Sequence, residues 1–298
     1  MNSLSCIARV KRTTDNDFNR PPDFPQYVFA SFTGDRSGSM SSMININNHV
    51  PAKGLYDFIK SQCDHALLNN QTAYISVTTF DNEDETFINN KKSTTISVGM
   101  NDCINWMDPR GSTKLYDTAI KCLNKLESNA QNLLESLPKN IKKLNPKITK
   151  IWSLLTDGFD NASFATAEDL RRTVLKARGD GTICYFLAAN MDAEEVGESF
   201  GFSAQNAMTF DADADHAEVG MRSVTVNMVR SASNGVSAPF TQMQRQSSQN
   251  TNMRHSSAPT SSFMNAINTP LSPSNFVTPP PLRRSRNQPP RMSRLVRS

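Results

Sequence analysis

An almost unbroken apolar run at residues 27–33 is the feature that most limits how this chain can fold. Apolar residues at both alternating positions are typical of a strand buried on both faces, as in a parallel sheet. The run leads into Asp35-Arg36-Ser37-Gly38-Ser39, which places one carboxylate and two hydroxyls within five residues. Oxygen ligands of this kind suit a hard divalent cation such as Mg²⁺.

Strand-like and helix-like segments alternate along the chain. The expected strands lie at residues 27–33, 72–80, 85–88, 94–98, 148–156, 182–188 and 207–210. The expected helices lie at residues 51–68, 101–107, 115–137, 166–177, 192–199 and 217–231. This order predicts a Rossmann-like, doubly wound α/β fold. Its mostly parallel sheet should carry one antiparallel edge hairpin, made by segments 72–80 and 85–88.

Composition divides the chain into three parts. Residues 1–24 are mixed and polar and predict an irregular arm, with one short strand expected near residues 4–10. Residues 25–234 have the composition of one globular domain. Residues 235–298 are rich in Ser, Gln, Asn, Pro, Thr and Arg, which predicts a disordered tail. The tail is basic and the rest of the chain is mildly acidic, and together they give the net charge of +4.

The number and spacing of the cysteines indicate the redox state of the compartment in which the protein works. The five cysteines are odd in number, and no two of them form a Cys-x-x-Cys pair. This pattern favours a reducing environment. No apolar leader opens the sequence, and no apolar run approaches the length of a membrane span. We therefore expect a soluble, cytoplasmic protein.

Two further loops carry oxygen ligands at the right places in this fold. Thr113 opens the helix expected from residue 115, and Asp157 follows the strand expected at 148–156. In a doubly wound sheet, loops at the carboxyl ends of strands meet at the topological switch point. The strands that end at Asp35 and Asp157 should be neighbours there. The sequence therefore predicts one site at which the three loops converge.

With these three loops, the sequence resembles the von Willebrand factor A domain family, also called integrin I-type domains. Asp35-Arg36-Ser37-Gly38-Ser39 matches the Asp-x-Ser-x-Ser motif of the family's metal-ion-dependent adhesion site. The segment from Gly111 to Asp117 resembles its threonine loop, and Leu155-Thr156-Asp157-Gly158 resembles its Thr-Asp-Gly loop. The resemblance covers about residues 25–230. Arg110 stands where the family commonly has Gly, and residues 41–50 form a long loop.

The resemblance implies a protein-interaction module and not an enzyme. It implies one Mg²⁺ or Mn²⁺ and a partner protein whose Asp or Glu completes the coordination. The implied metal ligands are Asp35, Ser37, Ser39, Thr113 and Asp157. The charges are compatible with this, because the two carboxylates carry −2 in total against a divalent cation. If they act partly through water, the metal remains electron-poor and would accept an anionic oxygen from outside.

A metal-dependent phosphoester hydrolase is the main alternative function. An aspartyl phosphatase would need a second carboxylate two residues after its nucleophilic Asp, but Ser37 stands at that position. The sequence contains no Gly-x-x-x-x-Gly-Lys-Ser/Thr phosphate loop. No His lies near Asp35, Thr113 or Asp157 in the sequence, so no general base is evident.

The tail allows three interpretations. Its arginines could contact nucleic acid or another acidic surface through charge, although sparse aromatic residues make base stacking poor. Its hydroxyl residues next to Pro or Arg are candidates for phosphorylation, which would offset the Arg charge. These candidates are Thr269, Ser272, Thr278, Ser285 and Ser293. The tail could also serve only to keep the protein soluble.

Two acidic segments outside the three loops receive simpler interpretations. The segment from Asp211 to His216 alternates carboxylates before an expected helix, so an N-cap is favoured over a second metal site. The acidic residues at 81–85 are interpreted as a solvated turn between two strands.

Overall fold

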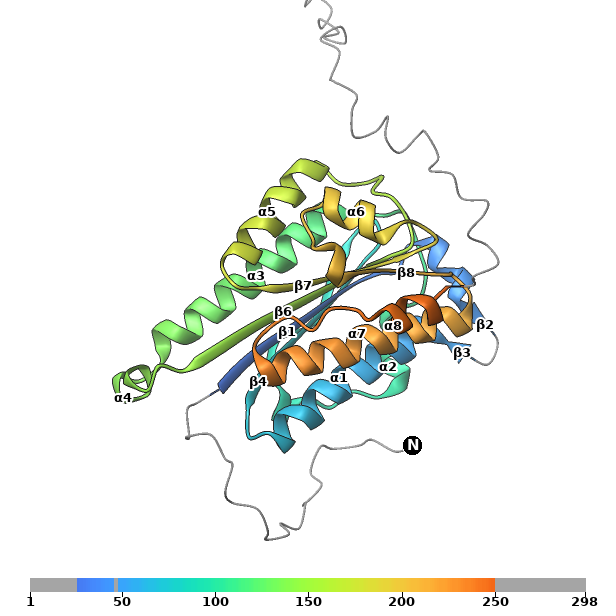
Figure 1. Cartoon of the computed structure of the whole chain (residues 1–298). Coiled ribbons are helices and arrows are strands. Elements are labelled where there is room, and N and C mark those ends of the chain that lie inside the picture. Colours follow the sequence, from blue (N-terminus) through green and yellow to red (C-terminus); the bar gives the residue numbers. More distant parts are fainter. Residues whose placement is uncertain (1–25, 46–47, 250–298) are drawn as a thin grey trace, which may run out of the picture. The chain divides into compact units, whose positions relative to one another are not determined.

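The computed structural model describes residues 26–45 and 48–249, and within them six strands form one sheet (Figure 1). The strands are β1 (Gln26–Asp35), β4 (Thr72–Phe80), β5 (Asp84–Lys92), β6 (Lys147–Thr156), β7 (Ile183–Ala189) and β8 (Ala207–Phe210). They pair in the order β5-β4-β1-β6-β7-β8. Only the β4–β5 pair is antiparallel, so the predicted doubly wound α/β sheet with one edge hairpin is confirmed.

Helices cover both faces of this sheet (Figure 1). One face carries α1 (Val50–Leu68), α2 (Met100–Trp106) and α7 (Ala214–Asn234). The other carries α3 (Leu115–Ser136), α5 (Ala167–Gly179) and α6 (Ala193–Ser199). The smaller elements are α4 (Lys139–Lys143), α8 (Gln242–Ser247), the strand pair β2 (Ile44–Asn45) and β3 (Asn48–His49), and 3-10 turns at Gly38–Met43, Ser93–Thr95 and Ala204–Asn206. None of the described helices is long and apolar enough to cross a bilayer.

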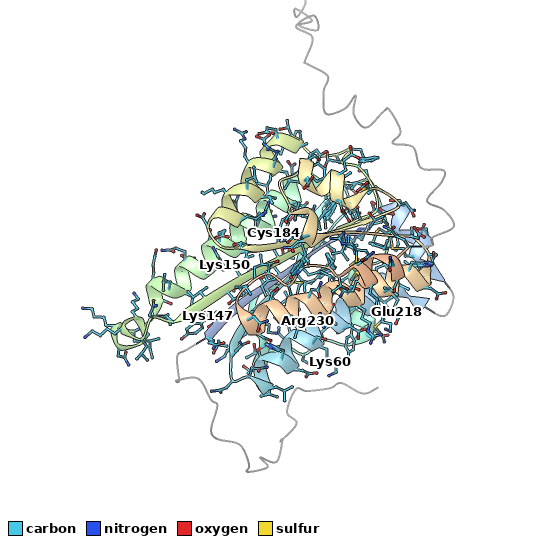
Figure 2. All side chains as sticks on the ribbon, viewed as in Figure 1. Lys60, Lys147, Lys150, Cys184, Glu218 and Arg230 are labelled. Carbon is cyan, nitrogen blue, oxygen red and sulfur yellow. The ribbon has the colours of Figure 1, made fainter. Side chains whose placement is uncertain are left out.

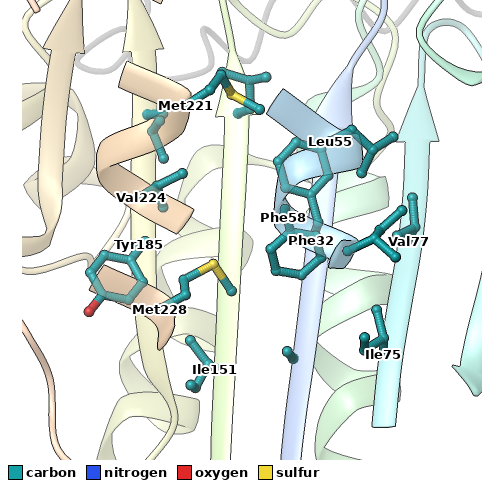
Figure 3. Close-up of a cluster of buried hydrophobic side chains, with 14 of the residues drawn as sticks. Phe32, Leu55, Phe58, Ile75, Val77, Ile151, Tyr185, Met221, Val224 and Met228 are labelled. Carbon is teal, nitrogen blue, oxygen red and sulfur yellow. The ribbon is translucent and has the colours of Figure 1, made fainter. Parts of the chain in front are cut away.

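The core between the sheet and the α1–α7 pair follows from the apolar strand sequences (Figure 3). Phe32 of β1 lies against Phe58 of α1, with ring centroids 5.6 Å apart. The two helices approach closely because Gly54 has no side chain, and an added Cβ there would come within 2.5 Å of Met221 Cε. At the surface of this helix pair, Lys53 donates a 2.8 Å hydrogen bond to Glu218 of α7, which is labelled in Figure 2.

One expected strand is absent. Segment 94–98 was predicted as a strand, but the structure has a 3-10 turn at Ser93–Thr95 followed by irregular chain. Here β5 is longer than expected and ends at Lys92. The chain then turns inward, where Ser93 and Ile96 are buried and Cys63 Sγ donates to the carbonyl of Ser93. Packing against α1 has overridden the strand preference of these β-branched residues.

The packed chain also continues past the domain boundary predicted at residue 234. We call residues 235–249 the C-terminal strap. Arg245 donates to the carbonyls of Ala204 and Ala207, at 2.8 and 2.6 Å, and Ser248 Oγ donates to the carbonyl of Thr209 at 2.8 Å. The strap therefore belongs to the domain. The irregular arm at 1–24, its strand near residues 4–10, and the tail from residue 250 lie outside the described residues.

Candidate metal-binding site

The first and third loops leave adjacent strands at the carboxyl end of the sheet. β1 and β6 pair in parallel with Gly34 opposite Leu155, so the predicted neighbouring of these two strands is confirmed. Thr156, the last residue of β6, donates a 2.8 Å hydrogen bond from Oγ1 to Asp35 Oδ2. Asp35 and Asp157 consequently emerge side by side, although 121 residues separate Asp35 from Thr156.

Asp35 lies at the floor of the site. Its side chain is buried, and its Oδ1 accepts a 2.7 Å hydrogen bond from the backbone N–H of Ser37. Burial raises the pKa of Asp35 to about 6, despite hydrogen bonds from Ser37 and Thr156 that favour the charged form. The negative charge of Asp157 acts in the same direction as burial.

Two serines link Asp35 to Asp157. The Oγ atoms of Ser37 and Ser39 lie 3.1 Å apart, and Ser39 Oγ donates to Asp157 Oδ1 at 2.8 Å. Burial also raises the pKa of Asp157, whereas the bond from Ser39 lowers it. Ser37 is buried and Ser39 is exposed, so this row of oxygens runs from the interior to the surface.

Thr113 reaches the same place from the second loop. A Cβ built on Gly158 would lie 3.8 Å from Ser39 Oγ and 3.9 Å from Thr113 Oγ1, so both hydroxyls border the space beside this glycine. Asn161 fixes the backbone of Thr113, because its Oδ1 accepts from Thr113 N at 2.8 Å and its own N–H donates to Thr113 O at 3.0 Å.

These residues fit a divalent cation by charge and by chemistry. The loops bring together three hydroxyls and two carboxylates, which are the hard oxygen ligands that Mg²⁺ and Mn²⁺ accept. Within the part of the chain that the structure describes, no Lys or Arg forms an ion pair with Asp35 or Asp157. A buried carboxylate without a countercharge is costly, and a cation would remove that cost.

Sequence reasoning missed the residues that anchor the loops around Thr113. Asp160 Oδ1 accepts from the N–H groups of Leu115 and Tyr116, at 2.7 and 3.2 Å, and so caps the start of α3. In return, Asp117 accepts from the N–H groups of Phe164 and Ala165 at 3.1 and 2.8 Å. Asp160 lies 45 residues from the helix that it caps, so no local pattern could reveal it.

The interpretation of residues 81–85 as a solvated turn is wrong for Asp81. Its side chain is 1% exposed and binds two arginines, Arg36 and Arg110. Burial raises the pKa of Asp81, but hydrogen bonds from Arg110 and the N–H of Glu83 and the charge of Arg36 outweigh it. The pKa of Asp81 therefore lies below its ordinary value.

The acidic segment before α7 behaves as a helix cap, as predicted. Asp213 is the N-cap residue and accepts from the N–H groups of Asp215 and His216 at 3.1 and 3.0 Å. Ligand atoms of Asp211, Asp213 and His216 also lie within 4.8 Å of one another. The five phosphorylation candidates of the tail lie outside the described residues.

Comparisons with known proteins find similar solved structures but no matching family. No protein-family model matches the chain, and no curated protein matches it. Among solved structures, it is similar to proximal thread matrix protein 1 from the mussel byssus. Identity is 18% and the TM-score 0.43, with 70% of this chain and 47% of that chain covered. The match therefore spans about half the length of the mussel protein.

Two von Willebrand domains are also similar to this chain. The vWF domain of the type V pili tip protein Mfa5 from Porphyromonas gingivalis is 10% identical, with a TM-score of 0.45 over 74% of this chain and 99% of that one. A von Willebrand factor type A structure from Catenulispora acidiphila is 14% identical, with a TM-score of 0.41 over 69% of this chain and 43% of that one. The fold assignment here rests on the strand order and register of the sheet itself.

Proposed function

We propose that this chain is a von Willebrand factor A-type domain that binds one Mg²⁺ or Mn²⁺ and captures a protein partner through the partner's Asp or Glu. The observation that carries the proposal is the 2.8 Å bond between Ser39 Oγ and Asp157 Oδ1, which joins loops 118 residues apart. Thr113 borders the same site. Because Gly158 has no side chain, the space next to the Ser39 and Thr113 hydroxyls stays open.

The charge of the site favours an acidic ligand. Ser37, Ser39 and Thr113 are neutral ligands, and if Asp35 and Asp157 act partly through water the cation stays electron-poor and attracts an anionic oxygen. Bound Mg²⁺ would supply a hard positive centre, and because Mg²⁺ retains water ligands when bound, an oxygen from outside could replace one of them. The surface position of Ser39 gives a partner's side chain access to the cation.

Direct metal titration tests the first half of the proposal. Wild-type protein should bind one Mn²⁺ per chain by calorimetry, and Ser37→Ala combined with Thr113→Ala should abolish the binding. The matched control is Ser41→Ala combined with Ser42→Ala, because these exposed serines lie in the same segment but outside the site. Absence of Mn²⁺ binding by the wild type would contradict the proposal.

Affinity capture tests the second half. A partner captured from the source cell in Mg²⁺ should be lost with a chelator and with the Ser37→Ala and Thr113→Ala pair. Blocking the partner's carboxylates, or replacing its critical Asp or Glu by Asn or Gln, should have the same effect. Turnover of generic phosphoesters that Asp35→Ala abolishes would instead support the hydrolase.

Binding through the basic tail is separable from this site. Nucleic-acid binding by the tail should survive Asp35→Ala and fall steeply with salt. It should disappear when residues 250–298 are deleted, a deletion that leaves the C-terminal strap in place. Such a result would place the partner's contacts in the tail and not at the three loops.

We also propose that the protein acts inside the cell. The support is the state of three cysteines in the described part of the chain, since Cys103, Cys122 and Cys184 are buried free thiols. Unpaired thiols are typical of reducing compartments. Fractionation of the source cell, with detection of the full chain, tests this location.

A further inference from the structure

A cluster of two arginines and two carboxylates lies between the first and second loops. Asp81 Oδ2 accepts from Arg36 Nε at 2.9 Å and from Arg110 Nε at 2.6 Å. Glu85 accepts from Arg36 Nη1 at 3.1 Å and from Arg110 Nη2 at 2.8 Å. Each carboxylate therefore bridges both guanidinium groups, and we call these four residues the arginine clamp.

Two side chains of the clamp are buried and two are partly exposed. Arg36 is 2% exposed and Asp81 1%, whereas Arg110 and Glu85 are 50% and 40% exposed. The Arg36 guanidinium also lies 5.8 Å from the centre of the Phe87 ring, which stacks on Trp106. A buried ion pair seldom adds net stability, since desolvation opposes its attraction, and its better attested role is to specify one arrangement of the chain.

Backbone hydrogen bonds tie the same segments together. Arg110 N donates to Arg36 O at 2.8 Å, and Gly38 N donates to Gly111 O at 3.2 Å. Arg36 N in turn donates to the carbonyl of Phe80 at 2.8 Å, the last residue of β4. The first loop is thus bonded both to the second loop and to the end of β4.

The β4–β5 turn supports the second loop directly. Lys114 N donates to Asp81 O at 2.7 Å, immediately after Thr113. Gly111 has a φ of 67°, and a Cβ added there would collide with Asn82 Oδ1. The second loop therefore rests on residues 81 and 82 with no room for a side chain at position 111.

We infer that the arginine clamp is a positioning device, which sets the distance between the Ser37 and Ser39 hydroxyls and Thr113. This inference rests on the proposed metal-binding function. Arg36 stands between Asp35 and Ser37, and Arg110 stands three residues before Thr113, so each arginine fixes the backbone that carries a ligand. Arg110 is also where the sequence departs from the family pattern.

Whether a substitution in the clamp strengthens or weakens metal binding distinguishes a positioning role from a purely electrostatic one. Removing a positive charge close to a cation site should tighten metal binding if only Coulomb interactions matter. Loss of positioning should weaken it, by about 10- to 100-fold as for other residues that orient metal ligands. A role in stability alone should change the melting temperature and leave the affinity of the folded protein unchanged.

The experiment is calorimetric titration of the full chain with Mn²⁺, using the wild type, Arg110→Met and Arg110→Lys. The half-exposed position of Arg110 keeps the risk to folding low. Both variants should bind Mn²⁺ at least about tenfold more weakly than the wild type. Arg110→Lys retains the charge but cannot bridge both Asp81 and Glu85 with a planar fork, so it separates geometry from charge.

Arg245→Met is the matched control. Arg245 is also tied to a carboxylate, Glu194, and to backbone carbonyls, but it contacts the start of β8, away from the three loops. The Arg245→Met variant should have a lower melting temperature in chelator and a Mn²⁺ affinity within about twofold of wild type.

The titration results distinguish failure of the proposed metal-binding function from failure of the positioning role. If the wild type binds no Mn²⁺, the proposed function fails, and the positioning role fails with it. If the wild type binds and both Arg110 variants bind equally well or more tightly, only the positioning role is overturned. Weaker binding by both Arg110 variants, with normal binding by Arg245→Met, supports it.

Discussion

Thr156 Oγ1 lies 2.8 Å from Asp35 Oδ2 and donates a hydrogen bond to it, while the same hydroxyl lies 2.9 Å from the carbonyl of Gly158. One side chain of β6 thus supports the buried carboxylate of the first loop and the backbone of the third. An amide at position 35 could take the place of the carboxylate, because Thr156 could then donate to Gly158 and accept from the amide.

The first prediction concerns Asp35→Asn in chelator. The pKa of Asp35 is raised to about 6 in the folded protein, so between pH 4 and 6 the folded state binds more protons than the unfolded state. The wild type should therefore lose unfolding free energy as pH rises through this window. The variant should match the wild type near pH 4 and exceed it by up to about 3 kcal/mol above pH 7.

Urea denaturation in EDTA from pH 4 to pH 8 measures this difference. Asp180→Asn is the control, since Asp180 is exposed and lies outside the site. Parallel pH curves for the wild type and Asp35→Asn would refute the buried, uncompensated carboxylate.

The second prediction concerns the space beside Gly158. Gly158→Ala would place a methyl group at ordinary contact distance, 3.8 and 3.9 Å, from the Ser39 and Thr113 hydroxyls. The melting temperature in chelator should change little, whereas Mn²⁺ affinity should fall about tenfold because the methyl group occupies the space between ligands. Gly179→Ala, with nothing within 4 Å of the added Cβ, should leave the affinity unaltered. Wild-type affinity in Gly158→Ala would show that the cation does not use this space.

The third prediction concerns the cap of α3. Asp160→Ala removes the acceptor for the N–H groups of Leu115 and Tyr116 and should lower the unfolding free energy by about 1 kcal/mol. Asp160→Asn keeps one acceptor oxygen and should lose less. Equal losses in the two variants, measured by chemical denaturation, would mean that the cap depends on the charge of Asp160.

The fourth prediction concerns the C-terminal strap. A chain ending at residue 234 loses the buried ring of Phe240 and the carbonyl of Ala238 that accepts from Tyr185. Burial of one Phe side chain contributes about 1.5–3 kcal/mol, so the unfolding free energy should fall by at least that amount. A chain ending at residue 249 should unfold like the full chain. Equal stability of the two truncated chains would show that the strap adds nothing to the domain.

The parts of the fold that the sequence predicted well are those with a strong local signal. The strand before Asp35 and the strand before Asp157 are apolar on both faces, a pattern typical of central strands in a parallel sheet. Their adjacency followed from the rule that loops meet at the switch point of a doubly wound sheet. The placement of Thr113 beside them needed the family resemblance as well.

What the sequence could not predict depends on contacts between distant segments. Asp81 sits in a run of acidic residues that resembles an exposed turn, and only the fold brings Arg36 against it. The strap was missed because Arg245 and Ser248 anchor it to backbone carbonyls, and composition carries no sign of such bonds. The strand predicted at residues 94–98 was wrong for the opposite reason, since tertiary packing outweighed a clear local preference for a strand.

The C-terminal strap also covers backbone groups at the outer edge of β8. An outer strand normally offers unpaired backbone groups to a neighbouring chain, which can lead to aggregation. At β8 the strap already occupies the carbonyls of Ala207 and Thr209. At the opposite edge of the sheet, β5 ends in Lys91 and Lys92, whose exposed charges disfavour pairing with an added strand. Both features disfavour polymerisation of the domain by strand addition at the two edges of the sheet.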